Sequence, residues 1–297
     1  MLQKGPPRPA PGIENATALG SQEGMSLITA PLFPAPPRLQ RSFGEIRASF
    51  EARSGVTYLS GLRQAGSARA ISLPGPELVI LNTSGGLTGG DRQEIRLTLG
   101  AGTRVTATTQ TAERVYKSPG GQAEISLQMS VGEGARLDWL PQETILFERS
   151  AAHRRTQIDL APDASCLSCE TVILGRTAMG EVLSDVSFRD ERLFTRAGRP
   201  VHFEPMHLNA DALRDTPAGL AGARVLSGTV LLGQGAEDAI GPVRAALDEP
   251  GVQGAASGFD GRLVVRLMAR DNWPLRRQLI RLLTVLRPSP LPRVWHS

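Results

Sequence analysis

The residue types best suited to chemistry in this sequence are its two cysteines and four histidines, and two short motifs contain most of them. Cys166 and Cys169 form a Cys-x-x-Cys pair, the spacing of half a zinc site or of a redox pair. The pair lies in a strand-like run, residues 165–174, and a three-residue spacing on a strand directs two side chains to opposite faces. We therefore expect two packed small side chains, with metal or redox use as the alternative.

The second motif is His202-x-Glu204-x-x-His207, which resembles a metal-binding cluster more than it matches one. The zincin order is His-Glu-x-x-His on a helix, and Pro205 breaks any helix across this pair. On a strand, His202 and Glu204 would share one face. Two interpretations of His202 follow. It could form a weak metal contact together with Glu204, or it could be an ordinary surface or loop histidine.

Residues 82–91 read Asn-Thr-Ser-Gly-Gly-Leu-Thr-Gly-Gly-Asp and contain two glycine pairs four residues apart. A phosphate-binding loop would need a helix to begin directly after the glycines. Here Ile95, Leu97 and Leu99 alternate with polar residues, which is typical of a half-buried strand. We therefore interpret the stretch as a structural glycine corner, where the backbone turns or another segment approaches closely.

The fold class follows from a repeated pattern. Residues 99–105 and 131–137 both contain the end of a strand, a Gly-x-Gly turn and the start of another strand, and residues 160–166 repeat the pattern loosely. Such units cannot each close a core alone, so they must stack on one another. The sequence predicts a mainly β protein with layered sheets in a coiled or sandwich-like progression.

The last third has a mixed pattern, and we expect a mixed α/β part from about residue 222. Residues 224–232 and 262–268 resemble strands, residues 236–248 resemble a helix, and Asp271 or Asn272 can cap a second helix. This second helix has Pro274 in its first turn and an apolar stripe of five leucines. The leucines are Leu275, Leu279, Leu282, Leu283 and Leu286, and Arg276, Arg277 and Arg281 lie off the stripe. The stripe could pack in the chain's own core or in the groove of a partner protein.

Composition limits the class of protein. The chain of 297 residues has 40% apolar and only 4% aromatic residues, with 32 glycines and 22 prolines, which favours many short strands and turns. The net charge of +4 without long runs of like charge argues against nucleic-acid or membrane-surface binding. Two cysteines and the lack of a signal-like or membrane-spanning segment indicate a cytoplasmic protein.

Residues 1–40 are rich in proline, glycine, serine and alanine, and we expect a flexible leader, with a docking peptide as the alternative. Met25 is a candidate for the true start of the protein. Residues 41–297 are expected to form a single domain.

Several strings of the sequence resemble the UreD (also called UreH) family of urease accessory proteins. The resemblance covers about residues 43–297, and the strings occur in the order of the family. They are residues 62–64, 85–91, 108–110 with 115–118, 139–147, 175–181 and 292–295. Many members have a histidine and two prolines before the first glycine pair, where this chain has Asn82-Thr83-Ser84, so we assign no role to these three side chains.

The resemblance implies a β-helix-like fold with about two helices near the C-terminus. It also implies a non-catalytic scaffold in urease maturation that binds apo-urease and, with UreF, recruits the GTPase UreG for nickel insertion. Nucleotide chemistry would belong to UreG, and nickel carriage to UreG and UreE. We expect no tightly bound cofactor, only transient Ni²⁺, for which His202 and Glu204 are weak candidate ligands.

Three acids of the family strings, Asp91, Glu143 and Glu181, follow sharp corners of the chain. One interpretation is that they accept hydrogen bonds from turn amides. The other is that they line an interior route for Ni²⁺, because oxygen ligands bind this ion weakly and suit transit. For partner binding, the candidates lie in the C-terminal part. They are Leu275, Leu279, Leu283, Arg293 and Trp295.

Two other classes of protein fit the sequence less well. A carbohydrate-active hydrolase or lyase would need paired carboxylates and aromatic side chains that stack on sugars, and three Trp with two Tyr provide few of the latter. A nickel-storage protein is disfavoured by the small number of histidines and cysteines.

Overall fold

The computed structural model describes residues 40–176, 179–214, 216 and 219–296. The leader predicted for residues 1–40, including Met25, lies outside the described residues except for Gln40. Two residues of the family string 175–181 also lie outside them, Thr177 and Ala178.

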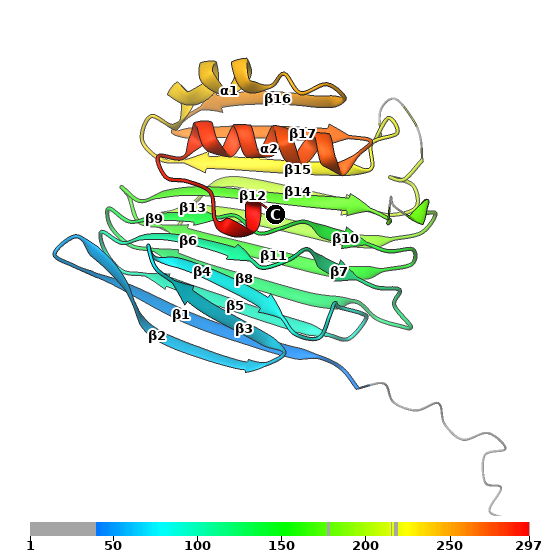
Figure 1. The fold of residues 1–297 in the computed structure, drawn as a ribbon, viewed down its shortest axis with the longest axis horizontal. Helices are drawn as coiled ribbons and strands as arrows, with labels where there is room; N and C mark the ends of the chain where they lie inside the picture. The colour runs from blue at the N-terminus through cyan, green and yellow to red at the C-terminus, as the bar shows by residue number, and fades with distance from the viewer. Residues whose placement is uncertain (1–39, 177–178, 215, 217–218, 297) are drawn as a thin grey trace, which may run out of the picture. The chain divides into compact units, whose positions relative to one another are not determined.

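Two β-sheets face each other in the described chain (Figure 1). Sheet A has seven strands in the order β14-β13-β11-β8-β5-β1-β2. Its strands are β1 (Phe43–Arg53), β2 (Val56–Gly66), β5 (Arg92–Leu99), β8 (Ala123–Val131), β11 (Ala151–Leu160), β13 (Ser187–Arg196) and β14 (Arg199–Leu208). The inner pairs of sheet A are parallel, and the hairpins β1–β2 and β13–β14 form its two edges.

Sheet B has ten strands, eight of them in the order β16-β17-β15-β12-β9-β6-β4-β3, with β7 and β10 beside this path. Its strands are β3 (Ala68–Leu73), β4 (Glu77–Asn82), β6 (Arg104–Thr109), β7 (Glu113–Val115), β9 (Arg136–Trp139), β10 (Thr144–Leu146), β12 (Ser165–Leu174), β15 (Val225–Leu232), β16 (Val252–Phe259) and β17 (Arg262–Ala269). The pairs β4–β6, β6–β9 and β9–β12 are parallel.

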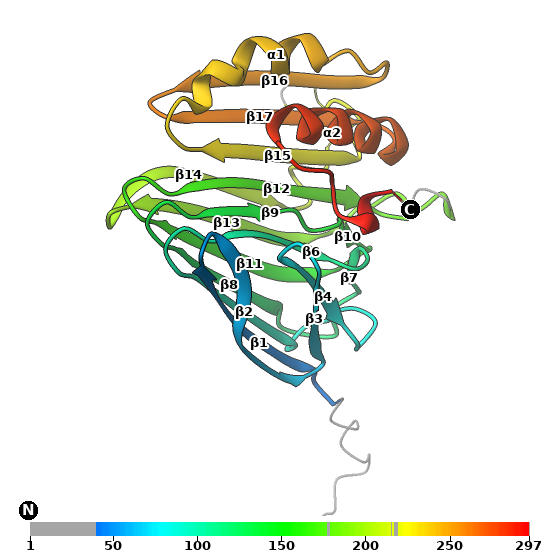
Figure 2. The same cartoon turned by 60° about the vertical axis from the view of Figure 1, so that its left-hand side comes forward.

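The chain alternates between the sheets and forms a β-solenoid (Figures 1 and 2). The three repeated units predicted from the sequence are the turns that lead from β5 to β6, from β8 to β9 and from β11 to β12. Successive turns stack: the amide of Gly102 donates to the carbonyl oxygen of Glu133 at 2.7 Å, and the amide of Gly134 to Oδ1 of Asp163 at 2.8 Å. The predicted coiled progression of β-sheets is therefore confirmed.

The glycine corner leads into β5 as predicted, and its glycines are needed for space. A Cβ on Gly86 would lie 2.4 Å from the ring of Tyr116, and one on Gly89 would lie 2.1 Å from Oγ of Ser118. The next turn of the solenoid therefore packs directly on the glycine backbone.

The C-terminal part adds β15, β16 and β17 to sheet B and places two helices on them (Figure 2). The helix predicted for residues 236–248 is a 3-10 turn, η2 (Ala236–Ala239), followed by α1 (Ile240–Ala246). The second predicted helix is α2 (Asn272–Leu286), and Oδ1 of its N-cap Asp271 accepts a hydrogen bond from the amide of Trp273 at 3.2 Å. A short 3-10 turn, η3 (Arg293–Trp295), follows near the end of the chain.

Among the described residues, no helix has both the length and the apolar character that crossing a bilayer requires.

Candidate functional site

In two successive turns of the solenoid the strand that belongs to sheet B is interrupted, between β6 and β7 and between β9 and β10. Residues 165–168 of β12 pair with β9, and residues 172–174 of β12 pair with β10. Strands β9 and β10 are therefore two parts of one strand that is interrupted at residues 140–143. Pro141 lies in this gap and lacks an amide hydrogen for the ladder. The gap at residues 110–112, between β6 and β7, lies beside it, because β7 pairs with β10.

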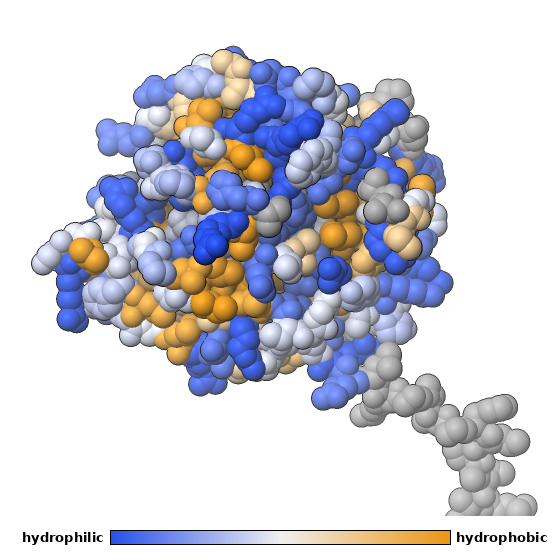
Figure 3. All heavy atoms as spheres, in the orientation of Figure 1, coloured by the Kyte–Doolittle hydropathy of each residue, from blue (hydrophilic) through white to orange (hydrophobic). Residues whose placement is uncertain are grey.

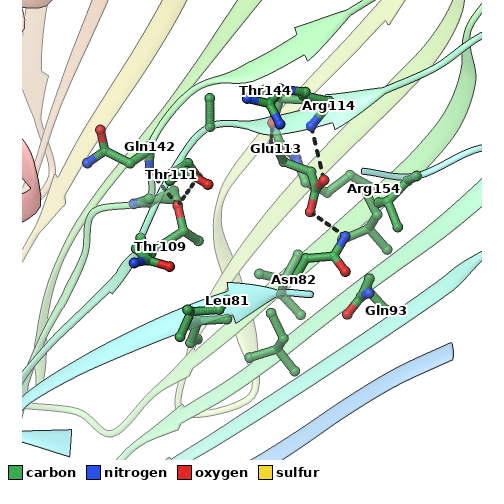
Figure 4. A pocket seen from close by; sticks show the side chains of 18 of the residues that line it. Leu81, Asn82, Gln93, Thr109, Thr111, Glu113, Arg114, Gln142, Thr144 and Arg154 are labelled. Atoms are coloured by element: carbon green, nitrogen blue, oxygen red, sulfur yellow. Dashed lines mark hydrogen bonds between the residues drawn. The ribbon is translucent and has the colours of Figure 1, made fainter. Parts of the chain in front are cut away.

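A cavity of about 280 Å³ extends from these gaps into the space between the sheets (Figure 4). Its lining includes polar side chains, among them Asn82, Thr111 and Gln142. Its walls are partly apolar, with Ile80 from sheet B and Ile95 and Leu127 from sheet A. The lining thus presents amide, hydroxyl and carboxylate oxygens together with the guanidinium groups of Arg114 and Arg154, and its described residues include no histidine or cysteine.

The inner end of the cavity is an ion pair that joins the two sheets. Arg154 of β11 lies 2.7 Å from Glu170 of β12, measured from Nη1 to Oε2. The same guanidinium donates two hydrogen bonds of 2.8 Å to the carboxylate of Asp190 on β13. Trp139 donates from Nε1 to Oε1 of Glu170 at 2.9 Å, and Arg154 donates to Oγ1 of Thr144 at 3.1 Å. The pairing compensates the high cost of burying these charges.

The charged cluster continues away from the cavity toward the edge of sheet A. Arg192 of β13 lies 3.8 Å from Asp190 and 3.0 Å from Glu204 of β14, and its Nη1 donates to the carbonyl oxygen of Gly228 at 3.0 Å. Glu204 also accepts from Nε of Arg266 at 2.9 Å. A Cβ on Gly228 would lie 2.5 Å from Arg192, so this glycine leaves the room that the guanidinium occupies. We call these six residues the ionic cluster: Arg154, Glu170, Asp190, Arg192, Glu204 and Arg266.

The two glutamates of the ionic cluster differ in acidity. Burial raises the pKa of Glu170, the positive charge of Arg154 opposes this effect, and the negative charge of Asp190 adds to it. Burial also acts to raise the pKa of Glu204, but His202, Arg192 and Arg266 outweigh it and lower the pKa to about 2. Of these two glutamates, Glu170 therefore gains a proton first on acidification.

Glu113 is an acid in the lining of the cavity (Figure 4). Its Oε2 accepts from Nδ2 of Asn82 at 3.1 Å, and its Oε1 accepts from the amide of Arg114 at 3.0 Å. Burial raises the pKa of Glu113 despite these two bonds. The two hydrogen bonds thus fix the carboxyl group in the lining.

Two of the three sequence-predicted route acids bind turn amides. Asp91 is buried, and its two oxygens accept from the amides of Ser42 at 2.7 Å and Thr88 at 2.8 Å. Glu181 accepts from the amides of Glu148 at 3.2 Å and Arg176 at 3.0 Å, and from Nε of Arg176 at 2.8 Å. Burial acts to raise the pKa of Glu181, but these bonds lower it overall. Neither acid lines the cavity.

Glu143, the third predicted route acid, lies in the gap between β9 and β10 and points to α2. Its Oε1 accepts from Nη1 of Arg276 at 2.8 Å, and the same nitrogen donates to Oε1 of Gln142 at 3.0 Å. The sequence predicted Arg276 off the leucine stripe, but the structure buries its side chain on α2 together with the leucines. The helix therefore contacts the same gap from which the cavity opens.

Most of the predicted partner-binding residues lie inside the chain. Leu275, Leu279 and Leu283 are at most 2% exposed and pack with β15 and β17 in one apolar cluster. Trp295 is also buried; its Nε1 donates to the carbonyl oxygen of Leu140 at 3.1 Å, and the guanidinium of Arg276 lies 5.1 Å from its ring. Of the five, only Arg293 is exposed. The packing corresponds to the intramolecular alternative for the leucine stripe.

His202 and Glu204 share a face of β14, as the strand pattern predicted, with Nε2 and Oε2 3.5 Å apart. The guanidinium groups of Arg192 and Arg266 already form ion pairs with Glu204. A metal cation would have to displace them or bind against their positive charge. His207 lies on the other side of β14 and is exposed.

Cys166 and Cys169 point to opposite faces of β12, which confirms the prediction. Cys166 packs between the sheets, and Cys169 packs under α2. Both are free and buried, and burial raises the pKa of both thiols. Within the described ranges, no group of three or more His, Cys, Asp or Glu residues is arranged to hold a metal ion.

Sequence reasoning missed Glu113 and most of the ionic cluster, although a local signal exists for part of it. On β11, Arg154 occupies the inward register between Ala152 and Thr156, and on β13 Asp190 and Arg192 stand between Phe188 and Phe194. Charged residues at inward positions of an alternating strand need partners nearby. The alternation pattern alone indicates that these charged residues need partners, but it does not indicate which strand supplies them.

Comparison with known proteins gives one consistent result. The sequence model of the UreD urease accessory protein family matches residues 42–296. The chain is similar to the urease accessory protein UreD of Cereibacter sphaeroides, with 55% identity over 270 residues, 88% of this chain and 98% of that protein. It is also similar to the proteins of the same name from Paracoccus denitrificans, with 48% identity over 90% of this chain and 98% of that protein, and Rhizobium leguminosarum bv. trifolii, with 43% over 88% and 98%. The chain therefore belongs to the UreD family of urease accessory proteins.

Proposed function

We propose that this chain acts in urease maturation as a non-catalytic scaffold that binds apo-urease together with the accessory proteins UreF and UreG, so that nickel can enter the urease active site. The observation that supports this most strongly is the family match over residues 42–296. The cavity is compatible with transient cation binding, because its described lining offers weak oxygen ligands. We also propose a cytoplasmic location, which the free cysteines support.

Within this role, we propose that Ni²⁺ passes transiently along acids in the interior of the chain. Asp91, Glu143 and Glu181 were the sequence candidates, and their oxygens already accept hydrogen bonds. Glu113 is the stronger candidate, because unlike these three acids it lines the cavity. Oxygen ligands suit a metal that must leave again.

The scaffold role is tested by co-expressing the full chain with its cognate UreF, UreG and apo-urease and isolating the assembly through a tag on the chain. Stable association, with nickel-dependent urease activity lost when the gene for the chain is deleted, is the expected result. Normal urease activity without the chain would overturn the proposal.

The route is tested separately by Glu113→Gln, with Glu143→Gln and Glu181→Gln as comparisons. We expect Glu113→Gln to assemble normally and to lower urease activation at limiting nickel, since the amide keeps the shape and loses the charge. Replacing the partly exposed Glu94 of β5 by Gln is the matched control. Unchanged activation by Glu113→Gln at every nickel concentration would rule Glu113 out.

A further inference from the structure

The first turn of the solenoid ends in a strand edge without the usual protection. Strand β2 is 11 residues long and pairs with β1 alone among the described strands. It contains no proline, its single charged residue is Arg63, and its one irregularity is Ser60, which has no partner in the register with β1. An edge strand of this kind presents a row of unpaired backbone N–H and C=O groups.

The other sheet edges of the described chain are shorter or better protected. Strand β14, at the opposite edge of sheet A, contains Pro200 and Pro205 together with several charged or imidazole side chains. Strand β3 has six residues, and β16 has eight and packs against α1 and η2. Natural proteins protect edges by shortness, proline, charge or cover, and β2 has the least of these.

Strand β2 is nevertheless held firmly in place. The register with β1 puts Thr57, Leu59, Leu62 and Gln64 on the side that faces sheet B. Oγ1 of Thr57 accepts from the amide of Arg104 at 2.9 Å, and Oε1 of Gln64 accepts from the amide of Ala70 at 2.8 Å. The edge is therefore preformed, which lowers the entropic cost of pairing with another strand.

Apolar side chains remain exposed at this end of the solenoid. Leu62 faces the layer between the sheets but is 39% exposed, because no further strand follows β2. Figure 3 shows apolar residues gathered over the part of the molecule where Figure 1 places β3 and β4. Five of the twelve exposed large apolar residues belong to the first three strands: Phe43, Val56, Leu62, Ile71 and Leu73. Of these five, Leu62 is the one on the inward side of its strand, so the uncovered part of the layer between the sheets at this end is centred on Leu62.

We propose that β2 is a docking edge at which an extended segment of a partner protein of the urease assembly adds as a further strand of sheet A. This inference rests on the proposed function, since it names where a partner of that assembly binds. The unpaired backbone groups select an extended segment over a helix. The segment continues the solenoid by one strand and covers Leu59 and Leu62.

The side chains of β2 define the chemistry of the incoming strand. On its inward side the strand places apolar residues over Leu59 and Leu62. On its outward side it faces Arg63, whose side chain is 70% exposed and shares the carboxylate of Glu45 with Arg47. Two guanidinium groups on one carboxylate leave a net positive charge, so the segment has an acidic residue opposite Arg63.

Amide hydrogen exchange of the full chain, free and in complexes with cognate UreF, UreG and apo-urease, tests the location. We expect exchange of the amides of β2 to slow by about tenfold or more in one of these complexes, while those of β14 are unchanged. Association of the wild-type proteins without protection of β2 overturns the docking edge and leaves the proposed function intact. No association overturns both.

Two further outcomes identify a different occupant and overturn the proposal. Slow exchange of β2 that depends on the concentration of the chain alone means that a second copy covers the edge. Slow exchange at every concentration of the chain alone means that another segment of the same chain covers it.

A pair of variants tests the chemistry. Leu62→Lys places a charge on the inward side of the edge and is expected to weaken association with the partner at least about tenfold, because a buried unpaired charge is costly. Phe203→Lys on β14 is the control, since Phe203 is 54% exposed and lies at the opposite edge of sheet A from β2. If Leu62→Lys alters exchange in the inner strand β8, Arg63→Glu replaces it and is expected to weaken association at low salt. Equal association by both edge variants and the control would overturn the assignment.

Discussion

Two rows of side chains on the inward face of sheet A differ completely in character, although the same strands present them. The first row crosses five strands in register, and its members are at most 2% exposed: Ala48, Leu97, Met129, Ile158 and Phe194. The second row lies four residues earlier on each strand and is largely polar: Gly44, Gln93, Ile125, Arg154 and Asp190.

The apolar row and the polar row depend on their neighbours in different ways. An apolar row is indifferent to which apolar residue stands opposite, and it sets the layer between the sheets through area and fit. The polar row needs defined partners, and replacing buried ion pairs by apolar residues is often neutral or stabilising. The buried ion pair of Arg154 and Asp190 beside the cavity therefore need not add net stability to the fold.

The largest expected effect comes from removing one partner of the charged row. Arg154→Ala leaves the carboxylates of Glu170 and Asp190 buried without their shared cation, and we expect a loss of about 3–5 kcal/mol in the free energy of unfolding. Urea-induced unfolding of the full chain measures it. The triple variant, in which Glu170→Gln and Asp190→Asn are added to Arg154→Ala, should recover part of the lost stability. A loss below about 1 kcal/mol for Arg154→Ala would mean that Arg154, Glu170 and Asp190 do not depend on one another for stability.

A comparable truncation in the apolar row should act through a different mechanism. Leu97→Ala removes buried methyl groups between Ala48 and Met129, and we expect a loss of about 2–5 kcal/mol. Because no charge is involved, the loss should be the same at acidic and neutral pH. A strong pH dependence would contradict the division between the two rows.

The sequence predicted the apolar row better than the polar row because the two depend on information of different range. Alternation within β5 and β8 indicates which residues face inward, and the turns near Gly102 and Gly134 indicate that the strands stack. Both signals are local. The apolar row then forms in any register that keeps apolar residues on the same side.

The polar row depends on which strands are neighbours. Arg154 meets Asp190 because β11 and β13 pair in parallel, and it meets Glu170 because sheet B closes over sheet A at that position. The break at residues 140–143 that opens the cavity becomes apparent only beside the unbroken β12. Likewise, the burial of Arg276 follows from η3, whose Trp295 lies against it. These are long-range contacts, and no local pattern specifies them.

Acid titration sharpens the contrast within the ionic cluster. The pKa of Glu204 is about 2 in the folded chain against an ordinary value of 4.5, so the unfolded chain binds more protons between these values and stability rises with pH across that window. Glu204→Gln should therefore be less stable than the wild type above pH 4.5, by roughly 3 kcal/mol at most. The difference should shrink as the pH falls toward 2.

Urea unfolding at a series of pH values measures this effect, with Glu94→Gln as the control. Glu94 is partly exposed and lies 4.0 Å from Arg96, so its loss should matter little at any pH. For Glu170, whose pKa burial raises, the sign is opposite: the folded chain binds the proton more readily, so this group alone makes stability fall as the pH rises. A constant difference between Glu204→Gln and the wild type would show that Glu204 acts through packing rather than charge.

The smallest expected effect comes from substitutions in the turns that follow the strands of both rows. Gly102 has a φ of 68° with open space around its Cα, so Gly102→Ala introduces backbone strain without a clash and should cost about 1 kcal/mol. Gly102→Asn should cost less, because asparagine tolerates the left-handed region. Gln93 of the polar row and Leu97 of the apolar row both lie on β5, which leads into this turn. Amide exchange near these two residues should therefore accelerate by the same factor. Acceleration near Leu97 alone would show that the polar row has its own support, in the ion pairs that connect it to sheet B.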